Sequence, residues 1–289
     1  MSKDAIMTNF IVPIDFSVDS LKGLQWAILF SQKKQVNIQM VYVLTNSSNF
    51  QASVVEAEQK YAGAEFRKLI QEYGPLMGNE SKLRFIIKKG KVYREIVNQA
   101  NSYKNAVVSA STHGASGFEE LFIGSNALKI MAATEQPVFT LRTKVPNRIK
   151  KIVVPIKMHR DTRQKAPIVA GLAALFDAEL HVISISTRNN KRDLARLESY
   201  SKQVIGFFKA KKLKTISKTL TGDSLASITC TYAEAVDADL ITIMSSAIDK
   251  WNVFFGSYAQ QMVRTAPVPL LSITPKEKQI PAGFSTFGG

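Results

Sequence analysis

An internal repeat is the feature of this 289-residue chain that most constrains its fold. Three short segments of the first half return in the second half, with their prolines, glycines and serines at matching places. The pairs are 11–15 and 153–157, 124–127 and 256–259, and 136–139 and 268–271. Because 289 residues suit two domains of ordinary size, the repeat predicts two copies of one domain, at 1–143 and 149–275. The remaining tail, 276–289, is rich in small residues and is expected to be disordered.

Within each copy, short apolar runs that suit buried strands alternate with segments of helical periodicity. In the first copy the pattern predicts strands at 9–14, 37–44, 83–87, 106–110 and 138–141, and helices at 17–32, 51–73, 92–100 and 126–133. Strands separated by helices form right-handed crossovers and therefore a doubly wound parallel α/β sheet. Ligands bind such sheets beyond the carboxyl ends of the strands, where the strand order reverses. Asp15, Val43 and Ser111 occupy these positions.

A loop of small residues, 111–126, joins the fourth predicted strand to a helix and is the strongest candidate for a ligand site. Its glycines let the backbone approach an anion closely, and the first N–H groups of the following helix are available as donors. Ser125 adds a hydroxyl where a helix N-cap is favoured. From these residues alone, a tight turn followed by a capped helix is an equal alternative.

Taken together, these motifs resemble those of the universal stress protein family. The resemblance covers about residues 8–143 and 150–274, and it implies two tandem adenine nucleotide alpha-hydrolase-like domains. It rests on V-P-x-D-x-S at 12–17, the helix-opening Gly90, the glycine loop with its Gly-Ser pair, and the terminal P-V-x-x-L strand at 137–141. ATP-binding members of the family carry G-x2-G-x9-G-(S/T). This chain has Ser111 at the first glycine of that pattern, and a serine Cβ crowds close backbone approach.

The resemblance implies an ATP site in the first copy. The Asp that follows the first strand contacts adenine in ATP-binding members, and the backbone at the end of the second strand contacts the base. These roles map onto Asp15 and Val43, and Pro13 of the same V-P-x-D-x-S motif is included among the expected nucleotide-binding residues. The loop and its Gly-Ser pair hold ribose and phosphates, which maps onto Ser111, Gly114, Gly124, Ser125 and Asn126. Any Mg²⁺ would arrive with ATP and be held in part by Ser125.

The second copy departs from this pattern. Lys157 stands where the adenine-contacting Asp should be, and the segment 244–256 reaches its Gly-Ser pair without G-x2-G. We therefore expect a degenerate copy that binds no nucleotide. Its terminal strand, at 269–273, is expected to pair with the strand at 137–141, as family dimers pair through this strand. The chain would then form an intramolecular pseudo-dimer, and association of tandem units into a homodimer is left open.

The net charge of +15 lies mainly in the second copy. Residues 1–143 hold 16 basic and 12 acidic residues, whereas 148–275 hold 19 and 10. The basic run 209–214 ends a predicted helix, where the helix dipole favours cations, and no aromatic residue interrupts it. A nucleic-acid partner is therefore not expected for this protein.

Catalytic motifs are missing from the sequence. There is no P-loop pattern, no Cys/His cluster has metal-ligand spacing, and His113 has no evident catalytic partner. The single cysteine, Cys230, is expected to be a buried, inert thiol. No apolar run approaches the ~20 residues of a membrane span, and the N-terminus lacks a secretory pattern. A cytoplasmic protein is expected.

The leading hypothesis is a non-enzymatic, ATP-responsive stress protein that binds nucleotide in its first domain and acts on a protein partner. A nucleotide-free interaction or scaffold protein of the same fold is the alternative. An ATP-using transferase or hydrolase is disfavoured by the missing catalytic groups, although slow ATP hydrolysis is left open.

Overall fold

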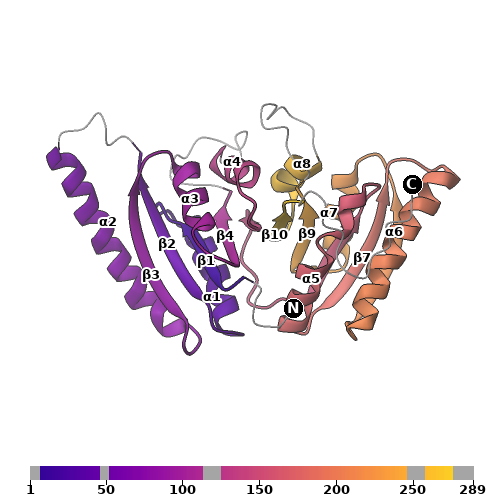
Figure 1. The fold of residues 1–289 in the computed structure, drawn as a ribbon, viewed down its shortest axis with the longest axis horizontal. Coiled ribbons are helices and arrows are strands. Elements are labelled where there is room, and N and C mark those ends of the chain that lie inside the picture. Colours follow the sequence, from indigo (N-terminus) through magenta and orange to yellow (C-terminus); the bar gives the residue numbers. More distant parts are fainter. Residues whose placement is uncertain (1–6, 46–51, 113–124, 246–257, 276–289) are drawn as a thin grey trace. The chain divides into compact units, whose positions relative to one another are not determined.

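The chain forms two compact units, Met1–Val145 and Pro146–Gly289. A computed structural model describes residues 7–45, 52–112, 125–245 and 258–275 (Figure 1). Within these residues each unit has a five-stranded parallel sheet flanked by helices. The predicted tandem parallel α/β organisation is therefore confirmed.

The first unit has the strand order β3-β2-β1-β4-β5. Its strands pair in parallel, with Pro13 opposite Val41 and Ile11 opposite Val108. The elements in chain order are β1 (Asn9–Pro13), α1 (Leu21–Ser31), β2 (Asn37–Leu44), α2 (Ala52–Tyr73), the 3₁₀ turn η2 (Gly74–Leu76), β3 (Lys82–Lys89), α3 (Val92–Asn101), β4 (Ala106–Ser111), α4 (Ser125–Ala133) and β5 (Val138–Leu141).

The second unit repeats this order as β8-β7-β6-β9-β10. Its elements are β6 (Lys151–Ile156), the 3₁₀ turn η3 (Arg160–Arg163), α5 (Ala166–Phe176), β7 (Glu179–Ser186), α6 (Lys191–Ala210), β8 (Thr215–Thr221), α7 (Leu225–Ala235), β9 (Leu240–Met244), α8 (Tyr258–Thr265) and β10 (Leu270–Ile273). The repeat extends to single hydrogen bonds. Gly90 donates its N–H to the carbonyl of Leu44 at 3.0 Å, and Gly222 donates to the carbonyl of Ser186 at 3.2 Å.

Most predicted elements of the first unit agree with the structure, and two strands have the predicted bounds. The first helix differs, because it begins at Leu21 rather than Ser17. Ser17 uses its hydroxyl in the preceding turn, where it donates to Asp15 and accepts the N–H of Ser20. Phe16 also has a left-handed backbone, with φ of 64°, which keeps this segment out of a right-handed helix.

Cys230 differs from its expectation as well. Its thiol was expected to be buried, but the residue is only half-buried on α7. It lines a hollow of about 420 Å³ with residues of α7 and α8. The Cys230 Sγ lies 3.5 Å from the hydroxyl of Thr265. The side chains of Ser227, Gln261 and Arg264 line the same hollow.

The core of the first unit is built around α1. Trp26, Phe30 and Phe139 are all buried, and each ring lies within 6 Å of the next. Phe10 on β1 adds a fourth ring, 5.0 Å from Phe30. Tilted and edge-on arrangements of this kind suit the charge distribution of aromatic rings and bury a large apolar area. This cluster attaches α1 to β1 and β5.

Close packing of α1 on β4 requires a glycine at position 23. A Cβ there would lie 2.4 Å from the backbone oxygen of Ser109. The Ser109 hydroxyl donates to the carbonyl of Gly23 at 3.0 Å, which ties the same two elements together. Any side chain at this position would have to push the helix away from the sheet.

We predict that Gly23→Ala lowers the free energy of unfolding by about 1–3 kcal/mol, because an extra methyl forces a backbone shift in a well-packed core. Gly63→Ala on α2 is the matched control. Its nearest heavy atom would be the Arg67 Nη1, 3.6 Å away, so the higher helix propensity of alanine should raise stability by up to about 1 kcal/mol. Urea unfolding of both variants provides the measurement, and equal effects would contradict the packing argument.

Candidate functional site

Three neighbouring strands end at one edge of the first sheet. β1 lies between β2 and β4, and its last pair with β2 joins Pro13 to Val41. Asp15 and Val43 each lie two residues beyond that pair, so the parallel register sets them at the same level. Ser111 is the last residue of β4. The structure thus brings Asp15, Val43 and Ser111 to the carboxyl edge, at the point where the strand order reverses.

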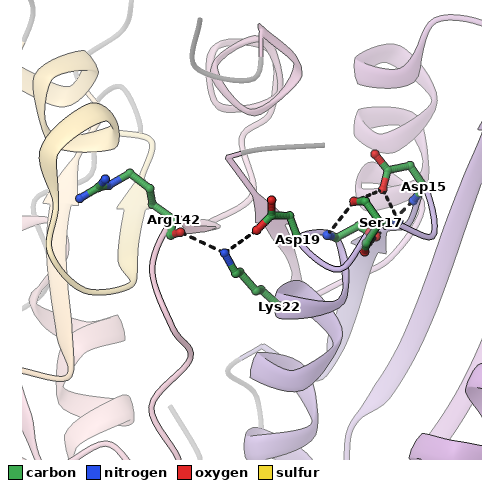
Figure 2. A network of polar contacts seen from close by, with 6 residues as sticks. Asp15, Ser17, Asp19, Lys22 and Arg142 are labelled. Atoms are coloured by element: carbon green, nitrogen blue, oxygen red, sulfur yellow. Dashed lines mark hydrogen bonds and ion pairs between the residues drawn. The ribbon is translucent and has the colours of Figure 1, made fainter. Parts of the chain in front are cut away.

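The carboxylate of Asp15 is held in a defined orientation. Its Oδ1 accepts the backbone N–H of Ser17 at 3.0 Å and the Ser17 hydroxyl at 2.5 Å (Figure 2). The backbone N–H of Asp15 donates to the hydroxyl of Ser20 at 3.4 Å. Asp15 is exposed, whereas Ser20 is buried. The turn therefore presents an oriented hydrogen-bond acceptor at the carboxyl edge of the sheet.

A second polar contact lies nearby on α1. The Lys22 Nζ donates to Asp19 Oδ1 and to the carbonyl of Arg142, as Figure 2 shows. Arg142 directly follows β5, so this lysine links the start of α1 to the end of the last strand of its unit. The Asp19 carboxylate is matched by a cation, and it does not compete with Asp15 for the role of acceptor.

Aromatic residues beside Asp15 were not identified from the sequence. Phe16 stacks on Tyr42 at 5.1 Å between ring centroids and meets Tyr61 edge-on at 6.0 Å. The Tyr42 hydroxyl donates to Glu58 at 2.9 Å. Burial and the Glu58 carboxylate raise the pKa of Tyr42 to about 12, so the phenol stays neutral near pH 7. The sequence signal that could have identified these rings is an aromatic residue beside each of two predicted site residues, Phe16 beside Asp15 and Tyr42 beside Val43.

The remaining predicted site residues are only partly described. Pro13 ends β1 and is half-buried, and Asn126 is exposed in the first turn of α4. Ser125 begins α4. Thr112, which follows Ser111, is buried and donates its N–H to the carbonyl of Leu141 at 3.2 Å. Gly114 and Gly124 lie outside the described residues, as do His113 and most of the predicted loop. The predicted phosphate contacts stay predictions.

The corresponding edge of the second unit has a different chemistry. Lys157 follows β6, and its backbone N–H donates to the Thr162 hydroxyl at 3.3 Å. Its Nζ lies 5.0 Å from the ring centroid of Tyr258 at the start of α8. A cation over an aromatic face is favourable, and burial lowers the pKa of Lys157. Lys157 therefore offers a hydrogen-bond donor at the position where Asp15 of the first unit offers an acceptor. The segment 246–257, with the Gly-Ser pair, lies outside the described residues.

A second lysine of this unit, Lys165, is 2% exposed. Its Nζ donates to the carbonyl of Pro155 at 2.5 Å. Burial and the nearby charge of Lys157 together lower the pKa of Lys165 to about 7. Neither lysine forms an ion pair with any residue that the structure describes. The half-buried Lys157 and the buried Lys165 together disfavour binding of a further cation at this edge. While both lysines are charged, their poor solvation lowers the stability of the folded state.

We predict that Lys165 makes stability depend on pH. An unfolded lysine has a pKa of 10.5, so between pH 7 and 10.5 the unfolded chain binds more protons than the folded chain. The free energy of unfolding should therefore rise with pH in this window, by up to about 1.4 kcal/mol per pH unit. That contribution is complete above pH 10.5 and is lost as the pH falls towards 7.

Lys165→Met tests this dependence, because it keeps the volume and removes the charge. The variant should be more stable than the natural protein at pH 7, and the difference should shrink by pH 9. Lys202→Met, on the exposed face of α6, is the control and should show no such pH-dependent difference. Denaturant titrations at both pH values give the comparison. If the free energy of unfolding of Lys165→Met changed with pH in parallel with that of the natural protein, Lys165 would titrate as an ordinary lysine.

The two histidines that the structure describes, His159 and His181, have hydrogen-bond partners within the second unit. His181 lies on β7, with Nδ1 3.0 Å from the Tyr232 hydroxyl and Nε2 2.8 Å from Glu179. His159 precedes η3 and accepts the N–H of Asp161. No group of three His, Cys, Asp or Glu residues suited to a metal occurs in the described ranges. The helices described there include none long and apolar enough to cross a membrane.

The comparisons with known proteins agree with this architecture. The profile of the universal stress protein family matches residues 7–142 and again 148–273. The chain belongs to the universal stress protein family, with two tandem domains. Comparison with curated proteins found no match.

Two solved structures extend over both domains. A universal stress protein from Archaeoglobus fulgidus DSM 4304 has a TM-score of 0.77 at 18% identity, covering 96% of this chain and 100% of its own. A protein from Pseudomonas aeruginosa UCBPP-PA14, provisionally assigned to the same family, has a TM-score of 0.67 at 17% identity and covers 94% of this chain and 95% of its own. At such identities the likeness establishes the fold.

Proposed function

We propose that this protein is a non-enzymatic regulatory protein whose first domain, and only its first domain, binds an adenine nucleotide such as ATP. The observation that carries the proposal is the oriented carboxylate of Asp15 beside Val43, at the switch point of the sheet. An adenine amino group donates hydrogen bonds, so it needs an acceptor. Asp15 supplies one, and Lys157 of the second domain supplies only donors.

The geometry supports a base at this edge for two further reasons. Along a strand, backbone N–H and C=O groups alternate between its two edges. Val41 bonds to Ile14 on the β1 side at 2.9 Å, so Val43 directs its backbone groups to the same side, where β1 has ended. The rings of Phe16 and Tyr42 add an apolar surface next to the carboxylate.

The proposed regulatory step follows from where the nucleotide would lie. Ribose and phosphates would contact Ser111 and the segment that leads to Ser125, with any Mg²⁺ arriving with ATP. A bound nucleotide would favour one conformation of that segment and so change the surface offered to a protein partner.

We predict one nucleotide per chain. Titration calorimetry with ATP should give a stoichiometry near one, and Asp15→Ala combined with Gly124→Val should lower affinity at least tenfold, because a charged hydrogen bond and close backbone approach are both lost. Lys157→Ala is the control and should leave affinity unchanged. Two equivalent sites, or undiminished binding by the double variant, would contradict the assignment.

The alternative, a nucleotide-free scaffold of the same fold, is favoured by one observation. Ser111 stands at the first glycine of the family's ATP pattern, and a Cβ there can block the backbone approach. Mass spectrometry of the ligand released from denatured, purified protein separates the two proposals. Co-purifying ATP supports the nucleotide-binding protein, and an empty protein that also ignores added ATP supports the scaffold.

For the second domain we propose a structural role, as the mate of the first in an intramolecular pseudo-dimer. Terminal strands of the two copies carry matching segments, at 137–141 and 269–273, and a strand edge without a partner tends to pair with another chain.

A chain ending at Arg142 should therefore self-associate or aggregate, because its terminal strand would lack the proposed mate. Multi-angle light scattering across a concentration series measures this association. The full-length protein is the reference. A well-behaved monomeric first domain would remove the argument for a pseudo-dimer.

A further inference from the structure

The edge strand of the first sheet carries a concentration of positive charge. Residues 82–94, which cover β3 and the start of α3, contain six basic residues and no acidic residue. We call these six residues, Lys82, Arg84, Lys88, Lys89, Lys91 and Arg94, the β3 basic surface. All are exposed except Lys88, which is half-buried. The segment belongs to the copy with the smaller overall excess of charge.

The β3 basic surface is not neutralised within the described part of the chain. None of its six residues forms an ion pair there, although Glu80 and Glu95 flank the segment. The lysines of α2 behave differently, because Lys60 pairs with Glu56 and Lys68 pairs with Glu65. A set of six cations without counter-charges produces a positive potential that attracts polyanions.

The strand register places part of this surface on one face of the sheet. Arg84 lies opposite Gln39 of β2, and Gln39 accepts hydrogen bonds from Gln99 and Tyr103 of the α3 region. Side chains alternate along a strand, so Lys82, Arg84 and Lys88 share this face. Phe85 points to the opposite face, where it stacks on Phe66 of α2 at 4.6 Å.

A hollow of about 260 Å³ opens on the same face, at the amino ends of the strands. Six polar side chains line it: Asn9, Asn37, Gln39, Lys82, Arg84 and Tyr103. Tyr103 is 37% exposed. Within the described residues, Gln39 Nε2 and Asn37 Oδ1 have no hydrogen-bond partner. The volume is below the ~300–1,000 Å³ of pockets for drug-sized ligands and suits one small planar group.

We propose that the β3 basic surface and this hollow bind single-stranded nucleic acid. Cations along the strand would contact successive phosphates, and the hollow would take a base against the Tyr103 ring, with amide groups available for its edges. An acidic peptide is the competing occupant. It would add to the sheet through the outward backbone groups of Leu83, Phe85 and Ile87, and it would leave the hollow and its amides unused.

The hollow is separate from the proposed nucleotide site, although Lys88 and Lys89 of the β3 basic surface lie opposite Val43 and Leu44. The hollow lies at the amino ends of β1, β2 and β3, whereas Asp15 and Ser111 lie at carboxyl ends. Binding here would not depend on adenine nucleotide, so the two proposals can fail independently.

Fluorescence anisotropy of the full-length protein with labelled 12-residue oligo(U) and oligo(dT) tests the proposal across a salt series. Single-strand binding should weaken with salt, with a slope of about −0.7 in log affinity against log salt for each phosphate contacted. Lys82→Gln with Arg84→Gln should reduce the slope by about 1.4, the loss of two contacts. Lys209→Gln with Lys211→Gln removes the same charge from the end of α6, and it should leave the slope and the affinity unchanged.

Tyr103 gives a second, uncharged readout. Tyr103→Ala should lower affinity roughly fivefold to tenfold through the lost stacking, and Tyr103→Phe should retain it. The proposal is overturned if neither oligonucleotide binds, or if the Lys82/Arg84 and Lys209/Lys211 double variants lose affinity equally. Tighter binding of a labelled polyglutamate peptide than of either oligonucleotide would also overturn it.

Discussion

The position of β1 between β2 and β4 is the constraint on which the candidate site depends. Its register pairs with β2 and β4 end at Pro13 and Ile11, while β2 and β4 continue past it. Asp15 and Val43 are thereby set level with one another, and Ser111 ends the strand on the other side. The packing of α1 maintains this arrangement, because Gly23 lets the helix approach β4 and the aromatic cluster attaches it to β1 and β5.

The two domains show how one backbone can carry opposite electrostatics. In the first, an exposed carboxylate is oriented by Ser17 at the end of β1. In the second, the half-buried Lys157 lies over the Tyr258 ring at the end of β6, and the fully buried Lys165 donates to the carbonyl of Pro155. Desolvated lysines are costly to keep charged, so the second edge is better suited to internal packing than to a ligand that donates hydrogen bonds.

The basic residues of the first domain also differ in whether a neighbouring carboxylate neutralises them. The two lysines of α2 are paired with neighbouring glutamates, while the basic residues of β3 and the start of α3 are unmatched among the described residues. A lysine-rich edge strand also discourages pairing with other chains. That role explains charge at an edge, but it does not account for a hollow lined by amides and a tyrosine on the face of the sheet.

The sequence by itself determined the repeat, the order of elements and the family. Proline, glycine and apolar periodicity act locally, so the strands at 37–44 and 138–141 were predicted with their observed bounds. It also placed Asp15 and Val43 at strand ends. Only the tertiary structure determined which side chains of different elements contact one another, because those contacts join residues far apart in the chain. The Phe16–Tyr42–Tyr61 rings and the unmatched cations beside the hollow depend on register and packing, which no local pattern records.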